Sequence, residues 1–244
     1  MPTIKLKSYR SLAITDRANV LDVIDDIDAI YNALSLDPVK IPIMTARRLS
    51  KGSKLALLIA NTFLQDDVEA LVFSSRHGEL MRSYNILEAI NTNLDISPTD
   101  FSMSVHNACA SQFLITNKLK LPYSSVAASE DTFLQGLFEC LNFLGFGYKK
   151  VLYIDFDSRL PEFYEKRLLN IPSYDFATAF LFTGFNANKD LVSDLNIEKN
   201  SCTDANLCDI DIDINKLQDR LLSILKKDNS MPMSLAFINY LKGL

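Results

Sequence analysis

Cysteine and histidine side chains are the first candidates for chemistry in this sequence. Cys109 lies in the segment HNACAS, three residues after His106, and His77 lies earlier, in SSRHGEL. A thiol activated by an imidazole is the nucleophile of cysteine-dependent acyl-transfer and thioester-hydrolysing enzymes. On one helix, however, packing alone would direct both His106 and Cys109, and buried cysteines are commonly structural. The residues by themselves leave a catalytic and a structural role for Cys109 open.

Carboxylates form the second candidate. Glu130 and Asp131 follow the small-residue segment SSVAAS and precede an apolar stretch with helical spacing. Exposed anionic side chains in the first turn stabilise a helix by about 0.3–1 kcal/mol each. An acid–base role would also require a substrate pocket. The segment Arg76–Glu79 has two similar interpretations, because it could bind an anion or cap the helix that follows.

Composition argues against metal, nucleic-acid and membrane binding. Cys109, Cys140, Cys202 and Cys208 show no CxxC spacing and are accompanied by only two histidines, so we expect reduced thiols, no metal site and no cofactor. The net charge is −5 and no Lys/Arg run exceeds two residues, which disfavours nucleic acid as a partner. No segment approaches the roughly 18 consecutive apolar residues of a membrane span, and the N-terminus lacks a signal-peptide core. We therefore expect a cytoplasmic protein without membrane insertion.

One stretch has the clearest local structure, from Leu121 to Asp157. Residues 123–128, small or β-branched after Tyr123, predict a short strand, after which Ser129 offers an N-cap oxygen. A helix should follow and end at Gly145 and Gly147, and the apolar run 151–156 suits a buried strand. This order predicts a βαβ unit whose strand-to-helix turn carries Glu130 at the carboxyl end of a sheet, where nucleophiles and anions are usually held. The helix is expected to bury Phe133, Leu137, Phe138, Leu141 and Leu144.

Alternating strand and helix patterns continue over most of the chain and predict a layered α/β domain. Residues 39–48 look extended, and the run 101–119 is apolar on nearly every face in its first half, which indicates burial against more than one surface. Ile210, Ile212 and Ile214 alternate with aspartates, which favours a surface loop or edge strand over a calcium loop because the required glycine is missing. Further helices are predicted at 15–37, 49–65, 80–90, 161–169 and 217–227, and further strands at 3–7, 70–74, 175–183 and 231–244.

The segment from Ser104 to Asp157 resembles the part of a β-ketoacyl synthase that surrounds its active-site cysteine, without a gap. Asn107, the pair Ala110-Ser111, Pro122 and the strand SSVAAS each find a counterpart. In this register the nucleophilic cysteine falls on Glu130, whereas Cys109 lies twenty-one residues too early. Together with SSRHGEL and FSMSVHNA, the pattern over residues 40–185 is similar to the short ketosynthase-like chain-length factors of aryl polyene pathways.

The resemblance implies a thiolase-like α/β fold with a mixed sheet flanked by helices, reduced to about the N-terminal half of a ketosynthase. We expect one domain over residues 1–244, with a core at 1–185 and a polar loop, helix and strand at 186–244 in place of the missing half. Ketosynthases also need two histidines downstream of the cysteine, and no histidine follows residue 106 here. The resemblance therefore implies no catalytic residue and an inactive subunit.

A ketosynthase-like subunit of this kind is expected to form a heterodimer with an active β-ketoacyl synthase, and to meet the acyl carrier protein through that complex. The resemblance places the partner on the edge strand, with interface candidates Ser124, Ser125, Val126, Ala127, Ala128, Val105 and Asn107. Bulky side chains near the pseudo-two-fold axis would close the partner's acyl tunnel, and the candidates are Met81, Tyr84, Phe101 and Met103, with Arg82 as a polar stop. The alternatives are a free-standing enzyme using Cys109 with His106 or His77, and a purely stabilising scaffold.

Overall fold

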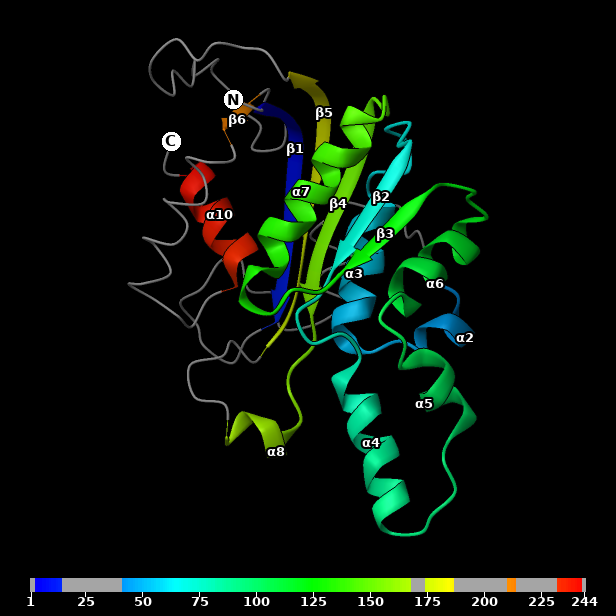
Figure 1. Cartoon of the computed structure of the whole chain (residues 1–244). Coiled ribbons are helices and arrows are strands. Elements are labelled where there is room, and N and C mark those ends of the chain that lie inside the picture. The colour runs from blue at the N-terminus through cyan, green and yellow to red at the C-terminus, as the bar shows by residue number, and fades with distance from the viewer. Residues whose placement is uncertain (1–2, 15–40, 168–173, 187–209, 214–231, 243–244) are drawn as a thin grey trace.

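A single mixed sheet organises the computed structural model, which describes residues 3–14, 41–167, 174–186, 210–213 and 232–242. Its six strands follow the order β3-β2-β4-β5-β1-β6. β2 runs parallel to β3 and β4, while β5 is antiparallel to β4 and β1, and β6 is antiparallel to β1. The carboxyl ends of β2, β3 and β4 therefore meet at one end of the sheet, the lower end in Figure 1. The strands are β1 (Thr3–Ile14), β2 (Ala70–Ser74), β3 (Tyr123–Val126), β4 (Lys150–Asp157), β5 (Asp175–Asn186) and β6 (Ile210–Asp213).

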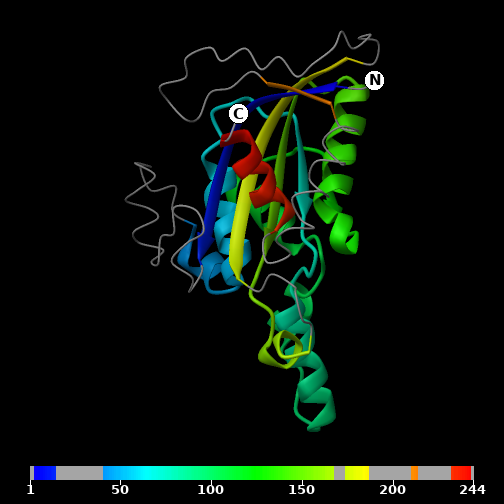
Figure 2. The ribbon, with the colours of Figure 1, turned by 90° about the vertical axis from the view of Figure 1, so that its left-hand side faces the viewer.

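Helices cover both faces of this sheet, α3 (Lys51–Asn61) and α6 (Ala108–Asn117) on one side, α7 (Thr132–Gly145) and α10 (Met233–Lys242) on the other. Figure 2 shows α3 and α7 on opposite sides of the strands. Because side chains alternate along a strand, Leu152 and Ile154 of β4 pack with α3 and α6, and Val151 and Tyr153 pack with α7 and α10. Both faces of the central strands are buried, which explains their nearly continuous apolar sequence.

Two further helices, α4 (Leu80–Asn91) and α5 (Pro98–Met103), lie together beyond the carboxyl ends of the parallel strands (Figure 1). Ser97 begins α5 as its N-cap, accepting a hydrogen bond from the Asp100 amide at 3.2 Å, and Pro98 takes the first helical position. The remaining short elements are α2 (Ile43–Ala46), the 3₁₀ turn η1 (Ser129–Asp131) and α8 (Glu162–Glu165).

Most predicted elements are confirmed. The strand at 70–74 and the helices at 49–65 and 80–90 are present with shifts of a few residues at their ends. The βαβ unit consists of β3, α7 and β4, with β2 lying between its two strands. α7 ends at Gly145, and its predicted apolar face is buried except for the half-buried Phe138. The strands predicted at 3–7 and 175–183 extend to Ile14 and Asn186, and 210–213 form an edge strand.

Three segments were predicted with the wrong local structure. Residues 231–244 were predicted as a strand, yet 233–242 form the helix α10, since the many apolar residues of this segment show no clear period that separates a helix from a strand. The segment 39–48 contains the short helix α2. The run 101–119 divides into α5 and α6, and Phe101 and Val105 are exposed because α5 projects beyond the sheet. The helices predicted at 15–37 and 217–227 lie outside the described residues.

Candidate functional site

Buried carboxylates organise the carboxyl ends of the parallel strands. Asp157, the last residue of β4, accepts hydrogen bonds from the Ser75 hydroxyl at 2.6 Å and from the backbone amides of His77 at 3.0 Å and Arg76 at 3.1 Å. The Ser75 hydroxyl oxygen in turn accepts a bond from the Gly78 amide at 2.8 Å. One carboxylate thus fixes the whole turn that leads from β2 to α4.

The same strand carries a second buried carboxylate, Asp155. It accepts a hydrogen bond from the Ser74 hydroxyl at 2.5 Å, and that hydroxyl also contacts the Tyr153 hydroxyl at 2.7 Å. Burial raises the pKa of Asp155 to about 6 and that of Asp157 to about 7, although the hydrogen bonds they accept act in the opposite direction. Near neutral pH these carboxyl groups are close to their titration points.

Glu130 lies where β3 ends, in the turn η1 that precedes α7. Its side chain is 84% exposed and forms an ion pair with Arg76 of the neighbouring strand end, 3.5 Å away. The predicted N-cap role of Ser129 was wrong, since Ser129 has a φ of 53° and begins the turn. Thr132 holds this turn instead, accepting from the Ala128 amide at 2.9 Å and donating to the Ser129 carbonyl at 2.7 Å. A carboxylate in this position cannot hold an acyl group as a thioester.

Cys109 is in a different environment. Its thiol is buried in the α3–α6 layer, with the sulfur 3.8 Å from the Ser53 carbonyl, and desolvation raises its pKa far above the usual range. The His106 ring bonds through Nε2 to the Ser75 carbonyl at 3.0 Å, and burial lowers the pKa of His77 to about 4. These surroundings favour a neutral structural thiol rather than an activated nucleophile.

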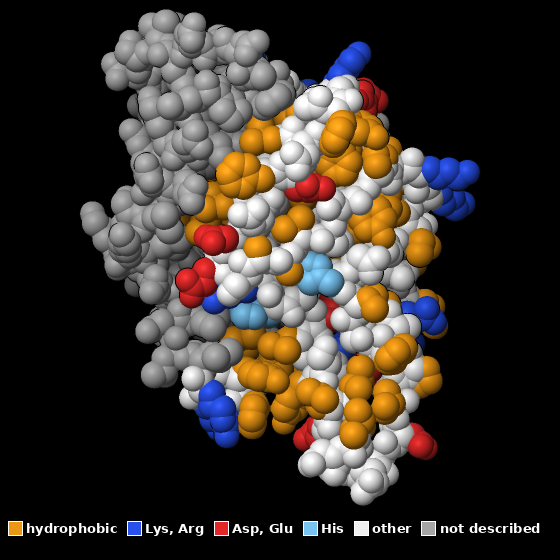
Figure 3. Space-filling view, viewed as in Figure 1, with side chains coloured by type: hydrophobic (Ala, Val, Ile, Leu, Met, Phe, Trp, Pro, Cys, Tyr) orange, Lys and Arg blue, Asp and Glu red, His pale blue; other side chains and the backbone are white. Residues whose placement is uncertain are grey.

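The tunnel candidates differ in how far they are exposed. Phe101 is 68% exposed and Met81 is 41% exposed, whereas Met103 is buried. Tyr84 is half-buried, and its ring contacts the rings of Phe163 and Tyr164 at centroid distances of 6.0 and 6.3 Å. Apolar side chains gather on this part of the surface, over α4 and α5 in Figure 3. Its exposed members are Met81, Leu87, Ile90, Leu94, Ile96, Phe101 and Val105.

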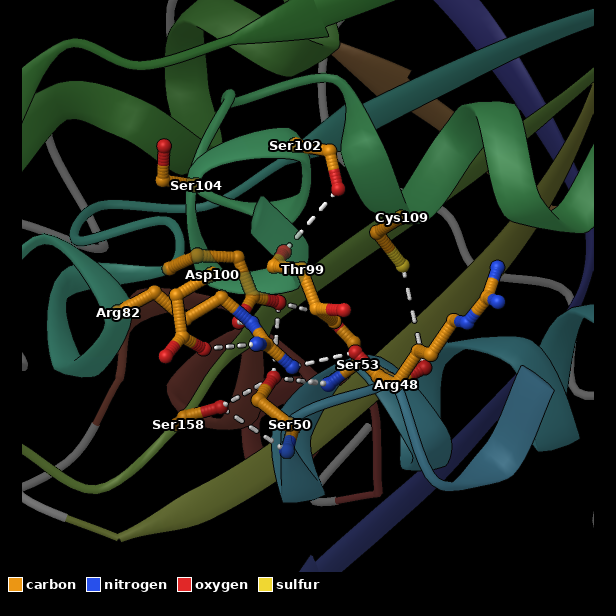
Figure 4. A network of polar contacts seen from close by, with 12 residues as sticks. Arg48, Ser50, Ser53, Arg82, Thr99, Asp100, Ser102, Ser104, Cys109 and Ser158 are labelled. Carbon is orange, nitrogen blue, oxygen red and sulfur yellow. Dashed lines mark hydrogen bonds and ion pairs between the residues drawn. The ribbon is translucent and has the colours of Figure 1, made fainter. Parts of the chain in front are cut away.

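Arg82, predicted as a polar stop, turns toward the body of the protein. Its guanidinium forms ion pairs with Asp100 at 2.6 Å and with Glu79 at 3.3 Å, and it donates to the Arg48 carbonyl. Figure 4 shows Arg82 and Asp100 within a network that also includes Ser50 and Ser158. Arg82 is therefore held within its own chain in this structure.

The interface candidates lie along one edge of the molecule. β3 is an edge strand of the sheet, and Ser124, Ser125 and Val126 are half-buried within it. Ala127 and Ala128 follow directly after the strand. Asn107 is exposed beside this edge, where its side-chain amide donates to the Tyr123 hydroxyl at 3.1 Å, and Val105 is exposed as well.

Sequence reasoning missed the buried network of Ser74, Ser75, Asp155 and Asp157. A signal was present, because two aspartates alternate in the otherwise apolar strand VLYIDFD, and two serines end the strand ALVFSS. Within the described ranges, no cluster of three or more histidine, cysteine, aspartate or glutamate side chains is placed to hold a metal ion. No described helix combines the length and apolar character needed to cross a bilayer.

Comparison with known proteins decides the family. Residues 27–233 match the family described as "Beta-ketoacyl synthase, N-terminal domain". The chain belongs to this family. The predicted layered ketosynthase-like α/β fold is thereby confirmed. The division at residue 185 stays a prediction, although the family match extends well past it to residue 233.

Two solved structures illustrate the relationship to this family. One is titled "Ketosynthase (ApeO) in Complex with its Chain Length Factor (ApeC) from Xenorhabdus doucetiae", with 36% identity and a TM-score of 0.60 over 73% of this chain and 79% of that chain. The other, "The ishigamide ketosynthase/chain length factor", shares the fold with 15% identity and a TM-score of 0.56, over 75% of this chain and 62% of that chain. Among curated proteins, none matches this sequence.

Proposed function

We propose that this chain is a chain-length factor, a non-catalytic partner of an active β-ketoacyl-[acyl carrier protein] synthase in the cytoplasm. In this role it forms a heterodimer with the synthase and shapes the far end of its acyl tunnel during aryl polyene biosynthesis. The acyl carrier protein is met through the complex. The observation that carries the proposal is the 36% identity to a chain of a ketosynthase–chain-length-factor complex.

The chemistry at the end of β3 supports an inactive role. Condensation needs a thiolate that carries the acyl chain, and the resemblance puts Glu130 at that position, where it pairs with Arg76. The thiol of Cys109 is buried, and its pKa is raised by desolvation. This environment gives no support to the alternative of a free-standing enzyme that uses Cys109.

An open sheet edge supports the heterodimer. The Leu71 amide donates to the Pro122 carbonyl at 3.0 Å, and the Ser75 amide donates to the Val126 carbonyl at 3.1 Å. Because alternate residues of a strand bond to the same neighbour, the backbone groups of Tyr123 and Ser125 face away from β2. Among the described residues, no strand pairs with this side of β3. Such an edge is suited to pairing with a strand of another subunit.

The exposed apolar surface of α4 and α5 supports a role at the tunnel. It continues toward the open edge through Val105 and Asn107, and Asn107 bonds to Tyr123 of β3. A subunit that paired through β3 would bring Phe101 and Met81 toward its partner. Bulky side chains there would limit how far a growing acyl chain extends.

The test is to reconstitute condensation with the ketosynthase and carrier protein and to measure product length. Phe101→Ala and Met81→Ala should lengthen the product while turnover continues, because each removes bulk from the proposed tunnel wall. Cys109→Ala is the control and should change neither length nor turnover. Failure of the chain to co-purify with a ketosynthase would contradict the proposal. A complex that forms, with product length unaltered by any substitution at Met81, Tyr84, Phe101 or Met103, would indicate a stabilising scaffold instead.

A further inference from the structure

The pair of helices α4 and α5, with their connecting loop at residues 92–97, is thinly packed on the rest of the protein. No residue of α4 is buried, and Met103 is the one buried residue of α5. Leu87 and Ile90, which the sequence places on the apolar face of α4, are more than half exposed. Apart from the ring contacts of Tyr84 with Phe163 and Tyr164, hydrophobic burial, the usual source of helix docking, therefore contributes little to the orientation of this helix pair.

Charged groups make the connection instead. Glu79, at the start of α4, accepts hydrogen bonds from the hydroxyl groups of Ser50 at 2.8 Å and Ser53 at 2.5 Å, both at the N-terminal end of α3. Arg82 pairs with the second oxygen of Glu79 and reaches Asp100 on α5 with Nη1. Its Nη2 group donates to the Arg48 carbonyl. A single guanidinium thus joins α4, α5 and the segment before α3, as Figure 4 shows.

Burial makes this connection stronger than a surface ion pair. The side chain of Arg82 is 13% exposed and that of Glu79 is 4% exposed. When one partner of a partly buried ion pair is removed, the remaining charge stays desolvated and unpaired, which costs more than breaking an exposed pair. The planar fork of arginine also fixes direction, because its donors diverge at set angles toward separate acceptors.

We infer that Arg82 is a positioning residue whose contacts with Asp100 and Glu79 set the orientation of α4 and α5 against the sheet. Resting on the proposed function, this makes Arg82 a determinant of product length that acts without lining the tunnel. Arg82 holds α4 and α5 in the position in which Met81, its neighbour on α4, and Phe101, the residue after Asp100, close the end of the partner's tunnel. Without the guanidinium, α4 and α5 would move relative to the sheet. The distribution of product lengths would then broaden.

The first measurement is hydrogen exchange of the full chain in isolation. In Arg82→Met and Asp100→Asn, amides of residues 80–103 should exchange about tenfold faster or more, while amides of β2 and β4 keep their wild-type rates. Asp100→Glu keeps the charge and should restore slow exchange. Glu165→Gln, which breaks the more exposed pair with Arg159, is the matched control and should leave residues 80–103 unchanged. Wild-type exchange in both Arg82→Met and Asp100→Asn overturns the inference, whatever the function of the chain.

The second measurement is product length in the reconstituted complex. Asp100→Asn and Arg82→Met should broaden the length distribution while the complex still assembles, and Asp100→Glu should restore the wild-type distribution. If Phe101→Ala changes product length and neither of these two variants does, the inference fails and the proposed function stands. If no substitution at Met81, Tyr84, Phe101 or Met103 changes product length either, the proposed tunnel role fails, and with it the role of Arg82 in product length.

Discussion

Aspartates at the end of β4 determine how this part of the sheet responds to pH. Asp157 is buried and holds the turn of residues 75–78 through three hydrogen bonds. Desolvation raises its pKa to about 7 from the usual value of 3.8 for an aspartate. The folded protein therefore binds this proton at pH values where the unfolded chain has released it, so raising the pH through this range favours unfolding.

Asp157→Asn should reveal this linkage. As the pH rises from about 4 to about 7, the stability of the wild type should fall relative to the variant, by about 1.4 kcal/mol for each unit that separates the two pKa values. Above pH 7 the difference should stay constant. His77 acts in the opposite direction, because its pKa is lowered to about 4 and its contribution to stability is lost as the pH falls below 6.5.

Urea unfolding of both proteins from pH 4.5 to 8 measures the difference directly and removes the contribution of His77, which both share. Asp95→Asn, in the exposed loop between α4 and α5, is the control substitution. Parallel stability curves for the wild type and Asp157→Asn would show that Asp157 does not titrate differently in the folded and unfolded chains.

The sequence predicted the burial of some residues but not the local conformation or side-chain direction of others. The spacing of apolar residues identified the buried side of α7, because that pattern depends only on helix geometry. The local conformation at Ser129 was not predictable in the same way, because the Thr132 hydroxyl stabilises a turn with Ser129 at positive φ by bonding to the Ala128 amide and the Ser129 carbonyl. Likewise, the sequence shows that Arg82 is charged but not where its side chain points, because its acceptors come from segments distant in the chain.

The close approach of α3 to β4 depends on Gly52. A Cβ atom at residue 52 would lie 2.3 Å from the Asp157 carbonyl oxygen and 2.7 Å from the Ser158 hydroxyl oxygen. The Gly52 amide also donates to that hydroxyl at 3.0 Å. The missing side chain therefore lets the first turn of α3 contact the strand end that carries the buried carboxylate.

Gly52→Ala should destabilise the protein by about 1–3 kcal/mol, because overpacking against backbone forces α3 away from β4. Without the clash, the same substitution would stabilise the helix by about 1 kcal/mol, because alanine has the higher helix propensity. The sign of the change in stability therefore shows whether the clash is present. Lys51→Ala, one residue earlier and exposed, is the control and should stay within about 0.5 kcal/mol of the wild type. Chemical denaturation measures both variants. A gain in stability for Gly52→Ala would show that α3 can move at no cost.

Element types were predictable where periodicity was clear and failed where it was absent. β2, α3 and α7 have distinct patterns and match the structure. The segment of α10 has no such pattern, because polar Ser234 is buried together with the apolar residues around it and residues 233–238 are all buried. The exposure of Phe101 and Val105 was unpredictable for another reason, since an apolar residue does not show whether its own chain or a partner covers it.

The proposed heterodimer would make the stability of this chain depend on its partner, through the open edge of β3 and the apolar surface of α4 and α5. Ligands that bind only the folded state stabilise it by mass action, by about 2.7 kcal/mol when their concentration is a hundred times the dissociation constant. For a chain of this size, each kcal/mol raises the melting temperature by about 2–4 °C. The proposed ketosynthase should therefore raise the melting temperature of this chain, increasingly with concentration.

Ser125→Pro tests whether that rise depends on strand pairing. Proline removes the residue 125 amide that faces away from β2 and leaves the bonds between β2 and the carbonyls of Pro122 and Val126 in place. The variant should keep the melting temperature of the isolated wild type within about 2 °C but lose most of the partner-dependent rise. Ser125→Ala retains the amide and should behave as the wild type does with the partner. If the partner raises the melting temperature of Ser125→Pro as much as that of the wild type, the two chains do not pair through β3. The exposed apolar surface of α4 and α5 would then have to supply the binding energy.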